Sequence, residues 1–126
     1  MREIKFRGLS KKGEWIYGDL IQRTHKFIFP TGVYAYNIFE FLIEVDHETV
    51  GQYTGLKDKN GTEIYERDII ENDGDDAHEV VTFDEGSFWL EGSTYTTPLH
   101  EVNTEAEEVI GNIHEHPHLL EVDSNA

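Results

Sequence analysis

The sequence predicts an all-β protein in which short, mostly antiparallel strands form a small barrel or roll with little helix. Short segments alternate apolar and polar side chains, which is the period of a half-buried strand. Glycine-containing turn signals separate these segments roughly every 8–12 residues, a spacing typical of barrels and related folds. Helix signals are limited to a capping box at 104–107 and to Pro117, and each of these signals predicts at most one turn.

The chain has 126 residues, a length that suits one domain covering residues 1–126. Two sub-halves, residues 1–49 and 50–120, are a possible division of that domain. Residues 121–126 are expected to form a frayed tail, as chain termini commonly do.

Five segments of the first half have the alternation or the β-branched and aromatic content of strands. Their residues are 3–7, 14–21, 27–29, 33–36 and 38–45. Gly18 predicts a bulge or sharp bend inside the second segment. Pro30 places the third segment at a sheet edge. In the fifth segment, Phe39, Phe41 and Ile43 are expected to face the same way.

The clearest turn of the chain is Asn60-Gly61, because Asn tolerates and Gly favours a positive φ. The polar residues 57–59 before it suit an exposed loop, and residues 64–70 after it contain the best strand. Two interpretations of this hairpin stay open. Either it is purely structural, or Tyr53 and Tyr65 form part of a binding face.

The second half contains four further candidate strands, at residues 78–84, 87–91, 94–97 and 109–110, and an acidic loop at 72–77. Phe88 and Trp89 are neighbours on one of these strands and therefore point to opposite faces. One of the two lies outside the main core, where it belongs to a second core layer or to an interface.

Charge excludes several function classes. Asp and Glu total 26 against 10 Lys and Arg, so the net charge is −16. Such a surface repels phosphate, which disfavours nucleic acid as a partner. No apolar run is long enough to span a membrane, and the N-terminus lacks the apolar core of a signal peptide. We therefore expect an intracellular protein without membrane contact. The absence of Cys excludes disulfides, a thiolate nucleophile and Cys metal sites.

A set of short motifs occurs in order along nearly the whole chain. The most specific is VGQYTGLKDKNG at 50–61, and the supporting motifs are REIKFR at 2–7, YGDL at 17–20, IYE at 64–66 and EVIGNI at 108–113, followed by Pro117 and Leu119-Leu120. Together they resemble the YopX family of phage and prophage proteins. The resemblance implies a β-rich fold with an SH3-like barrel in the second half and a place in the cytoplasm of a bacterial host cell. It implies no established activity, catalytic residue or cofactor.

Two departures from that family pattern concern possible sites. Arg67 stands where the pattern has Gly, so the local bend must accommodate a Cβ. His114, His116 and His118 stand where the pattern has Tyr, Asn and an acid. On an extended strand these three imidazoles would share one face, as in a three-His zinc site. Pro117 interrupts such a strand, so we predict no metal site there.

No catalytic signature is present, and acid pairs such as Glu66 and Asp68 are expected by chance among 26 acids. We therefore predict no catalytic, cofactor-binding or metal-binding residue and no enzyme. The first hypothesis is a phage or prophage accessory protein, a protein-interaction or self-assembling β-barrel module with a protein partner or a second copy. The alternatives are an acidic DNA mimic that inhibits a host DNA-binding protein, a nucleic-acid-binding SH3-like module, and a metal-dependent hydrolase using the histidines.

Overall fold

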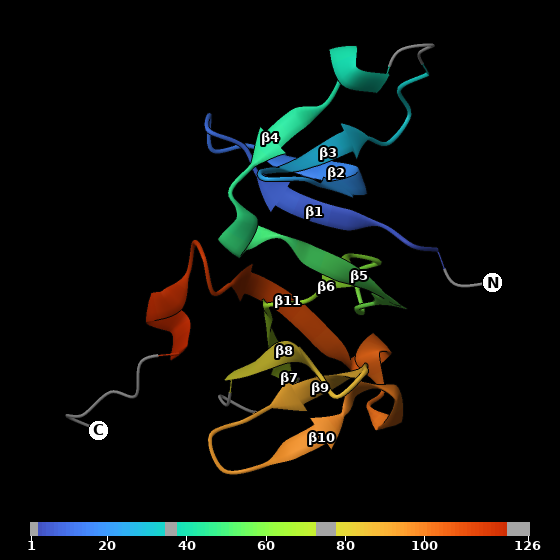
Figure 1. Cartoon of the computed structure of the whole chain (residues 1–126). Coiled ribbons are helices and arrows are strands. Elements are labelled where there is room, and N and C mark those ends of the chain that lie inside the picture. The colour runs from blue at the N-terminus through green and yellow to red at the C-terminus, as the bar shows by residue number, and fades with distance from the viewer. Residues whose placement is uncertain (1–2, 35–37, 73–77, 121–126) are drawn as a thin grey trace. The chain divides into compact units, whose positions relative to one another are not determined.

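The computed structural model describes residues 3–34, 38–72 and 78–120, and it separates into two compact units, Met1–Gly55 and Leu56–Ala126. Within the described ranges the regular elements are β-strands in two sheets and five short 3₁₀ turns (Figure 1). The predicted all-β class with little helix is confirmed. Most of the predicted acidic loop, residues 73–77, and the predicted tail at 121–126 lie outside the described residues.

The first sheet has the strand order β4-β3-β2-β1-β5-β6, and its paired neighbours β1 to β5 run antiparallel. Its strands are β1 (Phe6–Leu9), β2 (Trp15–Gln22), β3 (Lys26–Pro30), β4 (Ile43–Val45), β5 (Gly51–Lys57) and β6 (Glu63–Tyr65). Two short turns, η1 (Ile38–Glu40) and η2 (His47–Thr49), flank β4. Asp46 begins η2, because its side chain accepts a hydrogen bond from the Glu48 N–H at 3.1 Å.

The bulge predicted at Gly18 is absent, because β2 pairs with β1 and β3 through Gly18 without a register shift, but packing requires a glycine there. Gly18 pairs with Pro30 across β2 and β3, and the backbones approach so closely that a Cβ at Gly18 would overlap the Phe29 carbonyl oxygen. The Thr31 N–H then donates to the Tyr17 carbonyl at 2.9 Å. Only glycine fits this approach, which keeps β3 in register as the chain turns away.

The predicted strand over 38–45 is wrong in its first half. Residues 38–40 form the 3₁₀ turn η1, and only Ile43–Val45 pairs with β3 as β4. The alternation of Phe39, Phe41 and Ile43 indicated one buried face, but Phe39 and Phe41 are exposed. Alternation predicts a strand only where a neighbouring strand supplies hydrogen bonds. The pairing of β3 with β4 ends at Ile28 and Ile43, and β3 itself ends at Pro30, which has no N–H to donate.

The second sheet has the antiparallel order β10-β9-β8-β7-β11. Its strands are β7 (Asp68–Asn72), β8 (His78–Asp84), β9 (Ser87–Glu91), β10 (Thr96–Pro98) and β11 (Glu107–Asn112), with turns η3 (Leu99–Glu101), η4 (Thr104–Ala106) and η5 (Pro117–Leu120). The predicted bounds of β8 and β9 agree with the structure. The core of this unit is a cluster of buried aliphatic side chains from several elements, namely Ile64, Ile70, Val81, Leu90 and Leu99.

The prediction of a closed barrel is wrong, because the described residues form two open sheets. In the first sheet, one isolated antiparallel bridge joins Ser10, which follows β1, to Val45 of the edge strand β4, and this single bridge does not close the sheet into a barrel. The second sheet ends in β10, a three-residue strand that contains Pro98. Proline lacks the N–H that another strand would need, so this edge stays open. An SH3-like arrangement of the second half stays a prediction.

The central turn is built on the buried carboxylate of Asp58. One carboxylate oxygen accepts the N–H groups of Asn60 and Thr62, and the other accepts the Val109 N–H of β11, all within 2.9 Å. Gly61 has a φ of 79°, the positive value that the Asn60-Gly61 pair predicts for this turn. The specific motif at 50–61 therefore includes a residue that fastens a turn to a distant strand.

Candidate functional site

Three aromatic side chains in the connection between β3 and β4 are open to solvent. Tyr34 is 96% exposed, Phe39 is 69% exposed and Phe41 is 43% exposed. We call these three residues the aromatic segment. Between Phe27 and Ile43 the only charged residue is Glu40. A stretch with few charges and exposed aromatic rings is a common feature of surfaces that bind protein.

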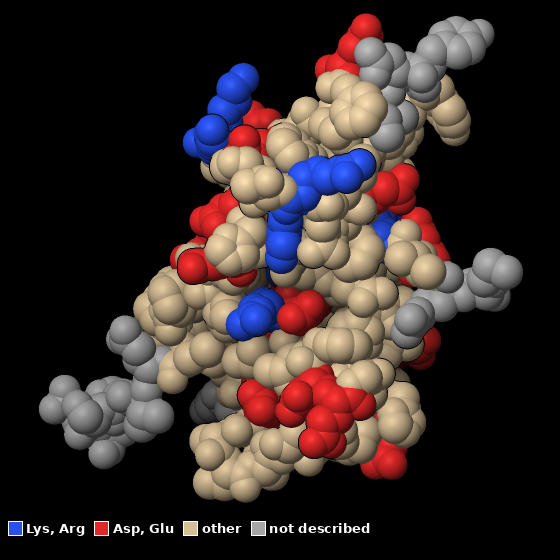
Figure 2. Space-filling view, in the orientation of Figure 1, with Lys and Arg blue, Asp and Glu red and all other residues tan. Residues whose placement is uncertain are grey.

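Charge is divided very unevenly between the two units. Residues 1–55 contain seven Lys and Arg and seven Asp and Glu, so the first unit has no net charge. Residues 56–126 contain three Lys and Arg and nineteen Asp and Glu, so the second unit carries the entire net charge of −16. On the face drawn in Figure 2, acidic atoms gather over the strands that Figure 1 labels β8 and β9.

Several acids of the second unit have structural roles. Burial alone would raise the pKa of Asp58. Hydrogen bonds from the backbone of Val109, Thr62 and Asn60, together with the charge of Lys59, lower the pKa by more than burial raises it, so the pKa of Asp58 lies below its usual value. Asp68 is buried, and its carboxylate accepts the Tyr65 N–H at 2.7 Å.

Glu66, which the sequence places beside Asp68, faces Arg67 instead, at 3.7 Å from the Arg67 Nε. Glu66 and Asp68 thus make different contacts, Glu66 with Arg67 and Asp68 with the Tyr65 N–H. Arg67 itself has a φ of 77°, the left-handed conformation that the family pattern reserves for Gly. The expectation that this bend must accommodate a Cβ is confirmed.

The three histidines near the C-terminus do not lie on an extended strand. The chain turns after β11, and the Asn112 side chain accepts the N–H groups of His114 and Glu115. The Nδ1 of His116 accepts the Asn112 N–H at 3.2 Å, and the rings of His116 and His118 meet edge to face at 6.1 Å. No group of three His, Cys, Asp or Glu among the described residues is arranged to hold a metal ion.

The remaining aromatic candidates pack inside the units. Tyr53 and Tyr65 are buried, so they do not form the binding face considered from the sequence. Phe88 packs on the core of the second unit. Trp89 projects from the other face of β9, and its indole N–H donates to the Asp84 carbonyl oxygen at 3.0 Å. Trp89 is thus the aromatic side chain outside the main core, and it is only partly buried.

The aromatic segment is the candidate site that the sequence analysis missed, because its residues were expected to lie in strands. Alternation over 38–45 indicated that Phe39 and Phe41 face the same way in a strand. Tyr34 was part of a further strand expected over 33–36, of which the described residues Val33 and Tyr34 belong to no strand. One sequence signal could have found the segment, since a 17-residue stretch with the single charge of Glu40 exceeds what a small sheet can bury.

Comparison with known proteins identifies a family and solved structures of similar fold. A family model described as YopX protein matches residues 5–121 of this chain. The crystal structure of protein EF1440 from Enterococcus faecalis is similar with a TM-score of 0.58 and 26% sequence identity, covering 96% of this chain and 100% of that one. No curated protein matches. No helix within the described ranges is long and apolar enough to span a membrane.

Proposed function

This chain belongs to the YopX family, and on that premise we propose that it is a non-enzymatic phage-type accessory protein that assembles with a second copy of itself through the aromatic segment. The observation that carries the proposal is the exposure of Tyr34, Phe39 and Phe41 in a unit without net charge. The free energy falls when a partner covers aromatic rings that were exposed to water, so such contact is favourable.

A second copy is the occupant that charge favours. Two copies that met through the second unit would bring together surfaces of −16 each, and their repulsion opposes contact. The first unit has no such penalty. A symmetric dimer buries the same patch on both copies, so the patch must complement itself. The aromatic segment meets this condition, because its surroundings between Phe27 and Ile43 carry a single charge.

The exposed area sets the strength expected of this contact. A fully covered aromatic side chain buries about 150–250 Å². Scaled by the exposed fractions of the three rings, the aromatic segment offers roughly 300–500 Å² per copy, compared with about 800 Å² per partner in a standard interface. The proposal is therefore a weak dimer with a Kd of roughly micromolar size.

Sedimentation equilibrium of the full chain across the micromolar range tests the proposal. The average mass is expected to rise from the 14.6 kDa of one chain toward twice that value as concentration increases. The double variant Phe39→Ser with Phe41→Ser is expected to raise the dimer Kd at least about tenfold, because it removes two of the three rings.

Phe83→Ser is the matched control, since Phe83 is 47% exposed but lies in the second unit. It is expected to leave the Kd unchanged. A single-chain mass at every concentration would contradict the proposal. Equal weakening by Phe83→Ser and by the Phe39 and Phe41 double variant would contradict the choice of surface.

The division of charge favours one second candidate function, a DNA mimic that binds a basic DNA-binding protein through the second unit. Six exposed acids lie in the described part of this unit, namely Asp84, Glu85, Glu91, Glu101, Glu105 and Glu115. Dense acidic surfaces attract basic partners over long range and release them at high salt. The same charge opposes the nucleic-acid-binding alternative.

The DNA-mimic candidate has its own test. Proteins retained by the immobilised chain from a bacterial lysate are challenged with duplex DNA and, separately, with salt. A mimic occupies the DNA site of its partner, so duplex DNA must displace that partner at a salt concentration that alone does not. Retained proteins that resist DNA would contradict the DNA-mimic function, whatever their identity.

A further inference from the structure

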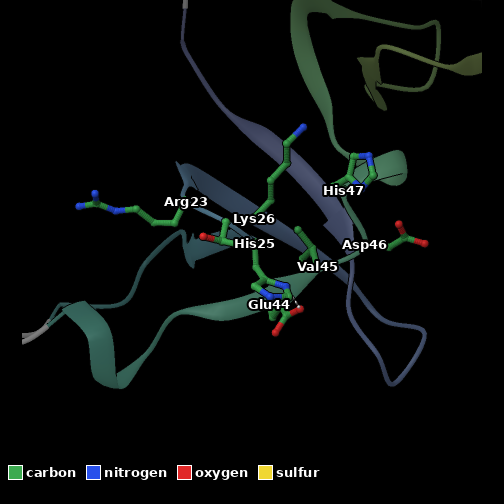
Figure 3. A pocket seen from close by; sticks show the side chains of 8 residues that line it. Arg23, His25, Lys26, Glu44, Val45, Asp46 and His47 are labelled. Atoms are coloured by element: carbon green, nitrogen blue, oxygen red, sulfur yellow. Dashed lines mark ion pairs between the residues drawn. The ribbon is translucent and has the colours of Figure 1, made fainter.

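Two histidine contacts of this chain respond oppositely to a proton. The first lines a cavity of about 410 Å³ between the turn before β3 and the end of β4, where the Nδ1 of His25 lies 3.1 Å from the Glu44 carboxylate (Figure 3). A proton on that ring strengthens this contact. The second contact follows β11, where the Nδ1 of His116 accepts the Asn112 N–H at 3.2 Å. A backbone N–H can only donate, so this contact requires an Nδ1 without a proton.

The ring of His116 lies directly on β11. A Cβ at Gly111 would come within 2.6 Å of the His116 Nδ1 and 2.8 Å of its Cγ, so the imidazole occupies the space where a side chain at position 111 would begin. Gly111 pairs with Ile69 of β7, and paired residues of antiparallel strands direct their side chains to the same face. His116 therefore lies over the face of the second sheet that carries Ile69.

The Ile69 face is the side of the second sheet opposite to its core. Ile70 belongs to the core cluster, and successive residues of a strand point to opposite faces, so Ile69 points away from that cluster. Ile69 is nevertheless fully buried. Val80 of β8 pairs with Ile69 and is therefore on the same face. The burial of Ile69 requires a cover on this side of the sheet.

Residues 113–120 supply this cover, and we call them the C-terminal cover. Besides the contact of His116 on β11, the cover is attached at η5, whose Leu119 carbonyl oxygen lies 2.6 Å from the Nδ1 of His78 on β8. His78 is two residues from Val80 and is therefore on the Ile69 face. A carbonyl oxygen only accepts, so His78 donates from Nδ1, which a further proton on its ring does not prevent. Acid therefore leaves the His78 attachment in place and disrupts that of His116.

No carboxylate balances a charge on His116 in the part of the chain that the structure describes, since no Asp or Glu there lies within 4.0 Å of its ring nitrogens. The rings of His116 and His118 meet edge to face with centroids 6.1 Å apart, so protons on both rings would repel each other. The Glu115 carboxylate accepts a hydrogen bond from the Asn112 side chain at 3.1 Å. The other charged or titratable groups of this face and of the chain that enters the cover are His78, Glu71, Glu108, Arg67 and His114.

We propose that the C-terminal cover is a pH-sensitive latch, which is closed over the Ile69 face at neutral pH and opens in acid when His116 takes up a proton. The open state binds a proton at Nδ1 that the closed state excludes, so falling pH shifts the population toward the open state. Histidine side chains commonly change charge between about pH 8 and pH 5. Opening bares Ile69 and Val80 on the face that also carries Trp89, which creates an apolar surface for a partner. The latch is independent of the proposed dimer, because all of its residues belong to the second unit.

Amide hydrogen exchange of the ¹⁵N-labelled full chain at about pH 7.5 and about pH 5 tests the latch, with rates expressed as protection factors that remove the intrinsic pH dependence of exchange. The Asn112 amide donates to the His116 ring, and the His116 amide donates to the Asn112 carbonyl oxygen at 2.8 Å. Both protection factors are expected to fall about tenfold in acid, as the loss of one hydrogen bond implies. A soluble paramagnetic probe is expected to broaden the Ile69 methyl resonances in acid alone. Unchanged protection at Asn112, or an equal loss throughout β8 and β9 that indicates unfolding of the whole unit, would overturn the latch.

Three variants identify the group that takes up the proton. His116→Phe keeps an aromatic ring that cannot be protonated, and it is expected to abolish the acid-dependent loss of protection at Asn112. Gly111→Ala places a methyl group where the His116 ring lies, so it is expected to open the latch already at neutral pH. His100→Phe is the matched control, because His100 is exposed in the same unit and lies outside the cover, and it is expected to keep the tenfold response. A full acid response in His116→Phe, or wild-type protection in Gly111→Ala at neutral pH, would overturn the role of His116.

Discussion

Replacing Asp58 by Ala removes the acceptor on which the central turn depends. The Asp58 side chain accepts three backbone N–H groups, from Asn60 at 2.8 Å and from Thr62 and Val109 at 2.9 Å. Its residue is 4% exposed, so water does not readily replace the carboxylate at the centre of the turn. The variant therefore loses three hydrogen bonds to a charged acceptor at once.

The size of the effect follows from where the three donors lie. A hydrogen bond to a charged group contributes about 1.5–3 kcal/mol. Asn60 and Thr62 are exposed, so water can satisfy their N–H groups in the variant, and each contributes about 1.5 kcal/mol or less. Val109 is partly buried, and its orphaned N–H costs the larger share. We expect Asp58→Ala to lower the free energy of unfolding by about 3–5 kcal/mol.

The assay is urea unfolding followed by the fluorescence of Trp89 in a Trp15→Phe background. The two tryptophans lie in different units, so this background reports on the second unit alone. Asp84→Ala is the control, because Asp84 is exposed and its carboxylate accepts only the neighbouring Glu85 N–H. A loss below about 1 kcal/mol in Asp58→Ala, or an equal loss in the control, would refute the role of Asp58.

Three further predictions concern stability. Because the folded-state pKa of Asp58 is depressed below 3.8, its contribution is fully present above pH 3.8 and is lost as pH falls through the folded pKa. The difference in unfolding free energy between wild type and Asp58→Asn should therefore shrink in acid, and a constant difference contradicts this. Arg67→Gly should raise the unfolding free energy by about 1 kcal/mol, since Gly relieves a φ of 77°, and a lower urea midpoint argues against strain there. Gly18→Ala should lower it by at least about 2 kcal/mol because its Cβ meets the Phe29 carbonyl, as thermal unfolding would show, whereas an unchanged midpoint contradicts the close approach.

Local turn chemistry and strand alternation were sufficient to predict β8 and β9 of the second sheet, whereas the strand expected over 64–70 is divided at Glu66 and Arg67 into β6 and β7, which lie in different sheets. The strands at His78–Asp84 and Ser87–Glu91 agree to the residue, because Glu85 and Gly86 form a tight turn whose φ values are both positive. The single turn at Pro117–Leu120 was also predictable, because Pro is favoured at the first helical position. These features depend on neighbouring residues and are therefore visible in the sequence.

The features that were predicted wrongly depend on residues far apart in the sequence. Residues 38–42 alternate like a strand, but whether they pair depends on how far β3 extends, and β3 ends at Pro30. Closure into a barrel depends in the same way on whether the edge strands β4 and β10 reach another strand. The cavity between the turn before β3 and the end of β4 escaped prediction because it joins residues 23–26 to 44–47, which are far apart in the sequence.

The role of Asp58 illustrates the same limit at a single residue. The sequence places Asp58 before an exposed Asn-Gly turn, where an acid is ordinary. Its bond to the Val109 N–H spans 51 positions, so local reasoning finds the turn but not its attachment to β11. The motif at 50–61 thus contains a residue that stabilises the fold, and none of its residues belongs to the aromatic segment.

The central claim is that two copies meet through the aromatic segment, and isotope-filtered nuclear Overhauser spectroscopy on an equal mixture of ¹³C-labelled and unlabelled full chains tests it most directly. The claim predicts intermolecular contacts from the ring protons of Phe39 and Phe41 to protons of the connection between β3 and β4 in the other copy. Intermolecular contacts confined to the second unit, or none at concentrations well above the micromolar range, would contradict it.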